Sequence, residues 1–385
     1  MTFEELRGKI AIVGADESDE IGEVPNKSTL HLQAEAVRNA LRDAGLKLSD
    51  VDGLFTAGTP VAVLAEYLGV IPRYYDGTSV GGCSFIVHVG HAMLALYHGL
   101  CDVAVVSHGE SGRSRVGVFR QSDPPGVPAT QFEQPFGPIG APTLFPMPMA
   151  RYMKDYGRTM EEFAEVAVNT RKWATLNPRA MMRDPITVED VLASRMISYP
   201  VTLFMCCLVT DAAGALVLVR SDRAQEMRKD PIYVLGVGEG LETHQVVQMR
   251  DFRFSQAYQN AGSRAFEMAG VTHDEIDFLE MYDAFVHTPI YALEALKFAK
   301  PGEALDLVKS GRMAPGGDLP MNTNGGGLSY THPGMYGMFT MTEAVRQLRG
   351  ERGEGQVPNA KIGLCHGVGG MFSAGGTAIF TNQRP

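Results

Sequence analysis

The sequence predicts an α/β protein built from two related halves, and three observations lead to this expectation. Short apolar runs rich in Val, Ile and Leu alternate with stretches of helical periodicity along most of the 385 residues. A pattern of Ala-Gly-apolar, three variable residues and acid-apolar-Asp-x-Leu occurs at 44–54 and recurs at 269–279. The beginnings of the two halves also match, as do their ends. The chain is therefore expected to divide into units of 1–225 and 226–385.

The first half is expected to contain four buried strands separated by helices. The strands are the apolar runs IAIVGA, DGLFTAG, DVAVVSHGE and GALVLVR. Helices are expected at about 30–45 and 84–98, and the second is apolar nearly all round, which predicts a central, buried position. Residues 112–205 have no counterpart in the second half. Their Pro- and Met-rich start and helical end predict an inserted loop domain that folds over one end of the sheet.

Composition and charge exclude several classes of function. A net charge of −10 disfavours nucleic-acid binding, which needs clustered Lys and Arg. No apolar run is long enough to span a membrane, and the acidic N-terminus does not read as a signal peptide. The five cysteines form no CxxC pair, which argues against a disulfide framework or a structural zinc site. A reduced, cytoplasmic protein is expected.

Cys83 is the strongest candidate nucleophile in the first half. It directly follows Gly81 and Gly82 and directly precedes the apolar helix. Unpaired backbone N–H groups and the positive end of the helix dipole favour a thiolate at this position. The alternative is a small buried cysteine with a packing role. His88 and His91 lie one turn apart in the same helix and are interpreted as packing residues, because no third metal ligand is recognisable.

The second half supplies three loops that follow predicted strands. Tyr282 belongs to MYDAF, directly after the strand IDFLE. Tyr330 and His332 lie in NTNGGGLSYTHPGMYG, where the proline after His332 favours an extended backbone. Cys365 and His366 are expected at the end of the short strand KIGLC, beside a glycine turn. Because α/β sites assemble at strand ends, these side chains are expected to converge with the first half's nucleophile.

These motifs, in this order, resemble the thiolase superfamily, in particular the sterol-carrier-protein-2-type thiolases and thiolase-like lipid-transfer proteins. The resemblance spans essentially the whole chain. It implies a duplicated, five-layered αβαβα fold, a homodimer, and chemistry on acyl-CoA thioesters with coenzyme A as co-substrate and no metal. It makes Cys83 similar to the family's acyl-accepting cysteine and His332 similar to the histidine that binds the thioester oxygen. Cys365 or His366 would activate the nucleophile and move a proton at the α-carbon.

The chain departs from the thiolase pattern at its nucleophile. Counting by the family's pattern places that residue at Gly82, so Cys83 is one position late. A branch of the superfamily lacks the cysteine and resembles retro-aldolases of β-hydroxyacyl-CoA, with two tyrosines at places that match Tyr282 and Tyr330. Members of that branch pair with a small zinc-ribbon OB-fold subunit that covers the CoA entrance, so such a partner is expected here.

Three functions follow from the resemblance. The first is a thiolase-type acyltransferase that cleaves or forms a C–C bond in a β-ketoacyl-CoA through an acyl-Cys83 intermediate. The second is a retro-aldolase that uses Tyr282 and Tyr330, and the third is a non-catalytic acyl-CoA carrier. The aromatic and Met content of 129–153 suggests a bulky or aromatic acyl group. Three arginines of the inserted segment are candidate contacts for the CoA phosphates: Arg151, Arg158 and Arg171.

Overall fold

The computed structural model describes residues 3–119 and 125–385; residues 120–124 of the predicted insertion lie outside the described part. Nine of the described strands join in one mixed sheet, in the order β3-β2-β4-β7-β1-β8-β11-β10-β9. Their bounds are β1 (Ile10–Glu17), β2 (Gly53–Thr56), β3 (Tyr74–Asp76), β4 (Ala104–Ser111), β7 (Asp211–Arg220), β8 (Ile232–Leu241), β9 (Phe278–Met281), β10 (Ile362–Gly369) and β11 (Ala374–Thr381). A separate hairpin consists of β5 (Met196–Ser198) and β6 (Val201–Thr202).

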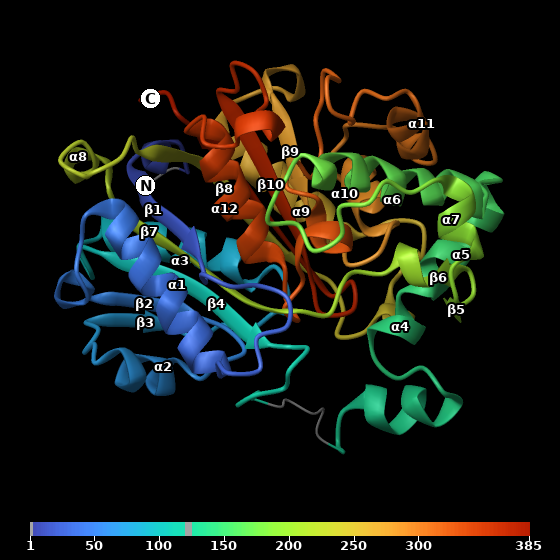
Figure 1. Ribbon diagram of the computed structural model, residues 1–385, viewed down its shortest axis with the longest axis horizontal. Coiled ribbons are helices and arrows are strands. Elements are labelled where there is room, and N and C mark those ends of the chain that lie inside the picture. The colour runs from blue at the N-terminus through green and yellow to red at the C-terminus, as the bar shows by residue number, and fades with distance from the viewer. Residues whose placement is uncertain (1–2, 120–124) are drawn as a thin grey trace.

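The strands sort by sequence into two neighbouring groups. The strands up to β7 lie on one side, those from β8 onward lie on the other, and the four strands predicted in the first half are confirmed as β1, β2, β4 and β7. Among the described strands, the two groups are joined by backbone pairing only where β1 pairs with β8, through Ala11 with Tyr233 and Ile12 with Ile232. Figure 1 shows the blue N-terminal strands beside the orange and red C-terminal ones. A unit boundary at about residue 225 stays a prediction, which this sorting supports.

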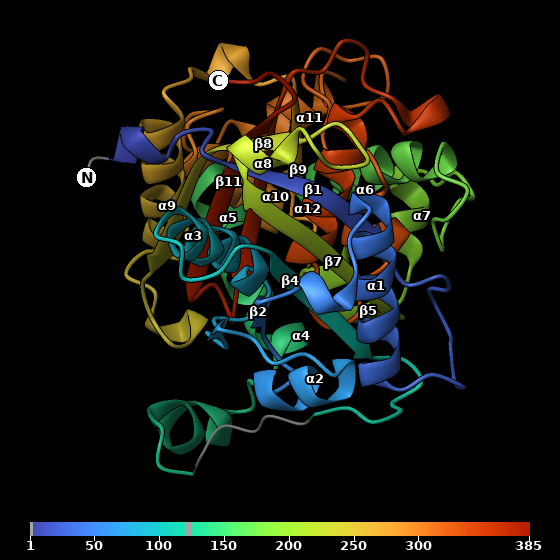
Figure 2. The same ribbon diagram turned by 90° about the vertical axis from the view of Figure 1, so that its left-hand side faces the viewer.

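Helices cover both groups and also lie between them. The main helices are α1 (Thr29–Ala44), α2 (Val61–Leu68), α3 (Ser84–Tyr97), α9 (Gln256–Ala269), α10 (Thr288–Ala295) and α12 (Gly337–Leu348). Helices α3 and α12 contact each other and strands of both groups, whereas α1 packs on β1, β7 and β4 and α9 packs on β8 and β11. Figure 2 shows α1 and α9 on opposite sides of the molecule. The predicted α-β-α-β-α order and the central position of the apolar helix are confirmed.

The repeated sequence pattern has a simple structural meaning. Its glycine ends a helix in both copies: Gly45 follows α1 with φ +77° and Gly270 follows α9 with φ +63°. A left-handed backbone at this position closes the last helical turn, and glycine adopts it without steric cost. The side of β1 that faces α1 and the side of β8 that faces α9 also carry glycines. A Cβ at Gly14 or Gly236 would lie about 2 Å from a helix carbonyl oxygen, 2.1 and 2.2 Å respectively.

The inserted segment forms α4 (Ala141–Leu144), α5 (Pro146–Tyr156), α6 (Met160–Thr175) and α7 (Val188–Ala193). This segment, green in Figure 1, packs on the C-terminal group of elements. Trp173 donates a hydrogen bond to Met313 O at 2.8 Å, and Tyr152 donates one to Glu294. The short helices α8 (Ser221–Ala224) and α11 (Ala304–Lys309) are the remaining α-helices of the described residues. Among the described residues, none of these helices combines the length and the apolar character that crossing a membrane requires.

Candidate active site

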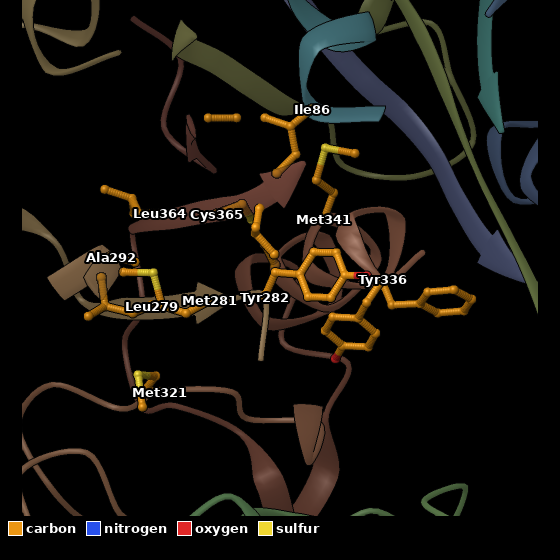
Figure 3. Close-up of a cluster of buried hydrophobic side chains, with 14 of the residues drawn as sticks. Ile86, Leu279, Met281, Tyr282, Ala292, Met321, Tyr336, Met341, Leu364 and Cys365 are labelled. Carbon is orange, nitrogen blue, oxygen red and sulfur yellow. The ribbon is translucent and has the colours of Figure 1, made fainter. Parts of the chain in front are cut away.

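Tyr282 and His332 form the centre of the candidate site. Tyr282 directly follows β9, and its hydroxyl lies 2.8 Å from Nε2 of His332. Both side chains are buried, and the ring of Tyr336 packs edge-on against Tyr282 and parallel to His332. Figure 3 shows Tyr282 just beyond the end of β9, beside Tyr336, with Cys365 on the neighbouring strand. The predicted convergence of the MYDAF and THPG loops is thus present in the structure.

The protonation of this pair follows from its burial. Burial lowers the pKa of His332 to about 4, so its imidazole is neutral at pH 7. Burial also raises the pKa of Tyr282 well above its ordinary value, so the phenol keeps its proton. The two side chains therefore share one hydrogen bond and can pass a proton between oxygen and nitrogen.

Strands of the N-terminal group hold the loop that carries His332. Thr210, directly before β7, accepts a hydrogen bond from the His332 backbone N–H at 2.8 Å. His108 of β4 is hydrogen-bonded to the carbonyl oxygen of Pro333 at 2.9 Å. The carboxylate of Glu110 lies so close to Gly334 that a Cβ there would come within 2.0 Å of Oε2. The site is thus assembled across the junction between the two groups of strands.

The side chain of Tyr282 fills the space that a side chain at position 82 would need. A Cβ on Gly82 would lie 2.1 Å from Cε1 of Tyr282 and 2.8 Å from the carbonyl oxygen of Val368. No real side chain can be accommodated at those distances. The position that the family pattern gives to the nucleophile therefore carries a glycine here, and a phenol ring stands in its place.

Cys83 lies directly before α3, as predicted, but its surroundings do not favour the expected thiolate. The thiol is fully buried, 4.0 Å from the carbonyl oxygen of Val80, and a Cβ on Gly369 would come within 2.6 Å of its sulfur. Burial raises the pKa of Cys83 to about 12. A Cβ on Gly367 or Gly376 would also meet Cys83 Cβ, at 3.0 and 3.3 Å. Dehydration of the sulfur between α3 and two strands outweighs the helix dipole.

Cys365 and His366 are inside strand β10, not at its end as predicted. Because successive residues of a strand point to opposite faces, the two side chains cannot serve the same site. The Cys365 thiol points toward α12 and donates to Thr340 O at 3.4 Å, and burial raises its pKa. The His366 ring packs against Tyr258 of α9 at 4.5 Å, with Nδ1 2.8 Å from the Thr377 hydroxyl. Among the described residues, no hydrogen bond joins Cys365 or His366 to Cys83 or His332.

His287, near Tyr282 in sequence, allows the lowered pKa of a buried histidine to be tested through the pH dependence of stability. Its ring is surrounded by those of Phe145, Phe285, Tyr291 and Phe372, and burial lowers the pKa of His287 to about 3.

A histidine with a lowered pKa stabilises the fold above its unfolded pKa near 6.5, and this stability is lost as pH falls toward the folded value. Relative to His287→Leu, the wild-type protein should therefore lose on the order of 2 kcal/mol of unfolding free energy between pH 6.5 and 4.5. Urea unfolding at several pH values measures this, with His31→Leu on the exposed side of α1 as the control. An unchanged difference between wild type and His287→Leu across this range would contradict the expectation.

Tyr330 is directed away from the Tyr282–His332 pair. Its hydroxyl donates to the carboxylate of Glu17 at the end of β1. The same carboxylate accepts hydrogen bonds from Thr342 and Arg346, both at 2.9 Å, and lies 3.8 Å from Arg179. Burial raises the pKa of Glu17, but the guanidinium groups of Arg346 and Arg179 outweigh burial and hold it below its usual value. In this arrangement Tyr330 joins its loop to β1 and α12.

A cavity of about 460 Å³ lies between the inserted segment and the loops that border the site. Cys207, Thr210 and Leu328 form part of its lining and also border the site loops: Cys207 N–H donates to Ala284 O at 2.9 Å. The rest of the lining is mainly apolar and includes Met181, Met182 and Phe204. Its charged groups are Arg171 and the ion pair of Arg113 with Glu23, at 2.9 Å.

The three arginines predicted to contact CoA differ in position. Arg171 lines the cavity and donates to Ser329 Oγ at 2.8 Å and to Asp184 O at 2.9 Å. Arg151 instead pairs with Asp155 in its own helix, at 2.7 Å. Arg158 pairs with Glu162 and Asp306. Their role in CoA binding stays a prediction, and Arg171 is the one that the structure places at the cavity.

Sequence reasoning missed Tyr336, His108 and Asp283. Tyr336 stands in the THPGMYG motif, and Asp283 is the acid of MYDAF, so a motif signal existed for both. The Asp283 carboxylate accepts from the Gly327 and Leu328 N–H groups, and burial raises its pKa to about 7. No sequence signal marked His108. Within residues 3–119 and 125–385, no cluster of three or more His, Cys, Asp or Glu side chains has the geometry of a metal site.

Comparisons with known proteins agree with this architecture. The family model described as Thiolase C-terminal domain-like matches residues 238–382. The acetyl-CoA acetyltransferase of Methanothermobacter thermautotrophicus is 31% identical over 97% of this chain and 99% of its own length. The 17-hydroxy-3-oxo-4-pregnene-20-carboxyl-CoA lyase of Mycobacterium tuberculosis is 34% identical over 90% of this chain and 92% of its own.

A solved structure is similar along nearly the full length of the chain. The Ltp2-ChsH2(DUF35) aldolase superposes with a TM-score of 0.89 at 31% identity, covering 98% of both chains. The similar proteins thus include an acetyltransferase, a lyase and an aldolase. The matching fold, the duplicated α/β units and these full-length similarities together show that the chain belongs to the thiolase superfamily, in its sterol-carrier-protein-2-type, thiolase-like branch.

Proposed function

We propose that this protein is a retro-aldolase that cleaves the Cα–Cβ bond of a β-hydroxyacyl-CoA thioester. The observation that carries the proposal is the place of Tyr282: its ring occupies the space of a side chain at Gly82, and its hydroxyl is hydrogen-bonded to His332. A phenol–imidazole pair can move a proton but offers no acyl-accepting sulfur. The similarity to a lyase and to an aldolase supports the same class of reaction.

The reaction needs one proton to travel from the β-hydroxyl to the α-carbon. The β-hydroxyl gives its proton to the Tyr282 oxygen while the phenolic proton passes to Nε2 of His332. The electrons of the O–H bond form the new carbonyl, and those of the Cα–Cβ bond pass to the thioester as an enolate. The proton then returns from His332 through Tyr282 to the α-carbon, which releases a ketone or aldehyde and a shortened acyl-CoA. No oxidant, reductant or water is consumed.

Thiolase-type acyl transfer is the second candidate, favoured by the position of Cys83 before α3 and by the similarity to an acetyltransferase. It would require the buried thiol to ionise and to reach a substrate carbonyl. The sulfur of Cys83 is fully buried against the glycines of β10, and the Tyr282 ring lies beside the neighbouring Gly82, so a substrate has no visible route to the sulfur. This opposes the acyl-transfer candidate. The third candidate is an acyl-CoA carrier that catalyses no reaction. It is disfavoured because binding alone does not require the buried, hydrogen-bonded pair of Tyr282 and His332.

Replacing Cys83 by Ala separates the two enzymatic candidates. Retro-aldol cleavage should proceed within about threefold of the wild-type rate, because a buried Ala preserves the packing at this position. Turnover of β-hydroxyacyl-CoA thioesters is measured by release of the shortened acyl-CoA, and intact mass is recorded after mixing with β-ketoacyl-CoA. Cys101→Ala, at another buried cysteine, is the matched control. Loss of turnover only in Cys83→Ala, together with an acyl adduct on the wild-type protein, would refute the proposal.

We further infer that coenzyme A binds through the cavity that Arg171 lines, with a bulky acyl group against its Met and Phe side chains. A small partner subunit is proposed because the similar aldolase structure is a complex of that kind. A homodimer is proposed at the open edge of the sheet, where β3 and its surroundings expose large apolar side chains: Tyr67, Ile71, Tyr75, Leu94, Tyr97 and Leu100. Co-purification from the native host, followed by mass determination of the complex, tests both assemblies.

A further inference from the structure

His108 of β4 is a buried histidine that the proposed reaction does not yet use. Gly109 faces α1, where a Cβ would lie 2.8 Å from Gln33 Cβ, so His108 and Glu110 face the opposite way, toward the His332 loop. The His108 side chain is 1% exposed, and its ring lies 4.6 Å from that of Phe85 in α3. It therefore stands between α3 and the loop that carries His332.

The hydrogen bonds of His108 fix its tautomer. Its Nε2 lies 2.9 Å from the carbonyl oxygen of Pro333, and a carbonyl oxygen can only accept, so Nε2 carries the proton. Burial lowers the pKa of His108 to about 4, so the ring is neutral and Nδ1 presents a lone pair. That Nδ1 is buried and has no hydrogen-bond partner among the described residues. A dry acceptor with no donor costs free energy, so a ligand that supplies a donor gains affinity there.

We propose that Nδ1 of His108 accepts a hydrogen bond from the β-hydroxyl of the bound substrate, before that hydroxyl turns to give the same proton to Tyr282, and so makes the site selective for β-hydroxyacyl over β-ketoacyl thioesters. The inference rests on the proposed function, because it places the β-carbon beside the Tyr282–His332 pair. A hydroxyl can donate to this nitrogen. A ketone oxygen carries only lone pairs and would face another lone pair, which is unfavourable.

The test compares binding of three CoA thioesters that differ only at the β-carbon: 3-hydroxybutyryl-CoA, acetoacetyl-CoA and butyryl-CoA. Calorimetric titrations use the full chain with Tyr282→Phe, so that turnover does not interfere. The hydroxy thioester should bind roughly tenfold to a hundredfold more tightly than the keto thioester. This is the usual difference between a ligand that makes one buried hydrogen bond and a ligand that places a lone pair against the same acceptor. Adding His108→Gln should abolish this preference, because the glutamine amide can keep the Pro333 bond but offers no acceptor at the Nδ1 position.

His88 supplies the matched control. Its Nε2 is bonded to a carbonyl oxygen, that of Thr78, and its buried Nδ1 also has no partner among the described residues, but it lies on α3 away from the His332 loop. His88→Gln should leave the preference intact. Two results would overturn the proposal. One is that the His108→Gln variant keeps the preference for the hydroxy thioester; the other is that the starting protein shows no such preference, because Nδ1 binds only an ordered water.

A second measurement does not depend on how well the variant folds. In the ¹⁵N spectrum of protein with labelled histidines, the Nδ1 signal of His108 should shift when 3-hydroxybutyryl-CoA binds and should not shift with butyryl-CoA. Equal responses to the two thioesters would overturn the proposal. Cleavage of β-hydroxyacyl-CoA by the wild-type protein without any hydroxyl preference would leave the proposed function standing and remove only the role of His108. A preference for the hydroxy thioester without any cleavage would leave the role of His108 standing and remove the proposed function.

Discussion

Replacing Tyr282 by Phe should lower cleavage of a β-hydroxyacyl-CoA by about 10²- to 10⁴-fold, the range expected for the loss of a positioned acid–base group. Phenylalanine keeps the ring beside Gly82 and Tyr336, so the fold should be retained. Only the hydroxyl that bonds to His332 is removed. The effect should fall on kcat, because the lost oxygen acts in the proton transfer and contributes little to holding the CoA part of the substrate.

Tyr336→Phe is the control for this substitution. Its ring packs against the same pair, but its hydroxyl donates to Asn324 at 2.8 Å and not to His332. Its activity should therefore stay within about tenfold of wild type, at most the worth of one neutral hydrogen bond. Steady-state kinetics of both variants, with thermal melts to confirm folding, show whether the Tyr282 hydroxyl takes part in the reaction. Full turnover in Tyr282→Phe would exclude the phenol from the chemistry.

The fold could be predicted from the sequence because its signals are local or repeated. The Ala-Gly pattern marks a helix end in both copies, where the glycines take a left-handed backbone. Apolar runs predict buried strands by composition alone, and four of them are found as expected. The central position of α3 followed from its lack of a polar face. None of these inferences needed a distance between residues far apart in the chain.

The site could be predicted only in part because its decisive distances join remote segments. Two hundred residues separate Gly82 from Tyr282, so nothing local shows that the ring of one fills the space beside the other. The thiolate expected at Cys83 was inferred from the helix terminus, whereas burial beneath Gly369 decides its protonation. The end of β10 was placed too early. Its extension through Gly369 puts Cys365 and His366 on opposite faces.

The N-terminal strands act as the frame for a loop of the C-terminal half. Residues at the ends of β1, β4 and β7 contact the segment 330–334 through side chains: Glu17, His108, Glu110 and Thr210. Most of these groups are buried, so solvent cannot replace a missing partner. The position of His332 therefore depends on residues more than a hundred positions earlier, and the junction between halves is itself part of the site.

Replacing Glu17 by Gln should lower the free energy of unfolding by about 3 kcal/mol, because it leaves the largely buried guanidinium of Arg346 without its main counter-charge. The Glu17 carboxylate is fully buried and holds Arg346 at 2.9 Å, while Asp16 holds the same guanidinium at 3.1 Å from a more exposed position. Asp16→Asn is thus the matched control, and its cost should be at most about 1 kcal/mol. Denaturant unfolding of the two variants measures the difference.

The pH dependence of this effect identifies its electrostatic origin. Since the pKa of folded Glu17 lies below its usual value, its stabilisation is present above about pH 4.5 and is lost as pH falls through the lower, folded value. The gap between wild type and Glu17→Gln should therefore narrow below pH 4.5. Tyr330→Phe removes a neutral donor to the same carboxylate and should cost about 1 kcal/mol while cleavage activity is retained. If Tyr330→Phe instead keeps full stability and loses cleavage, its hydroxyl leaves Glu17 when substrate binds, and Tyr330 belongs with Tyr282 in the chemistry.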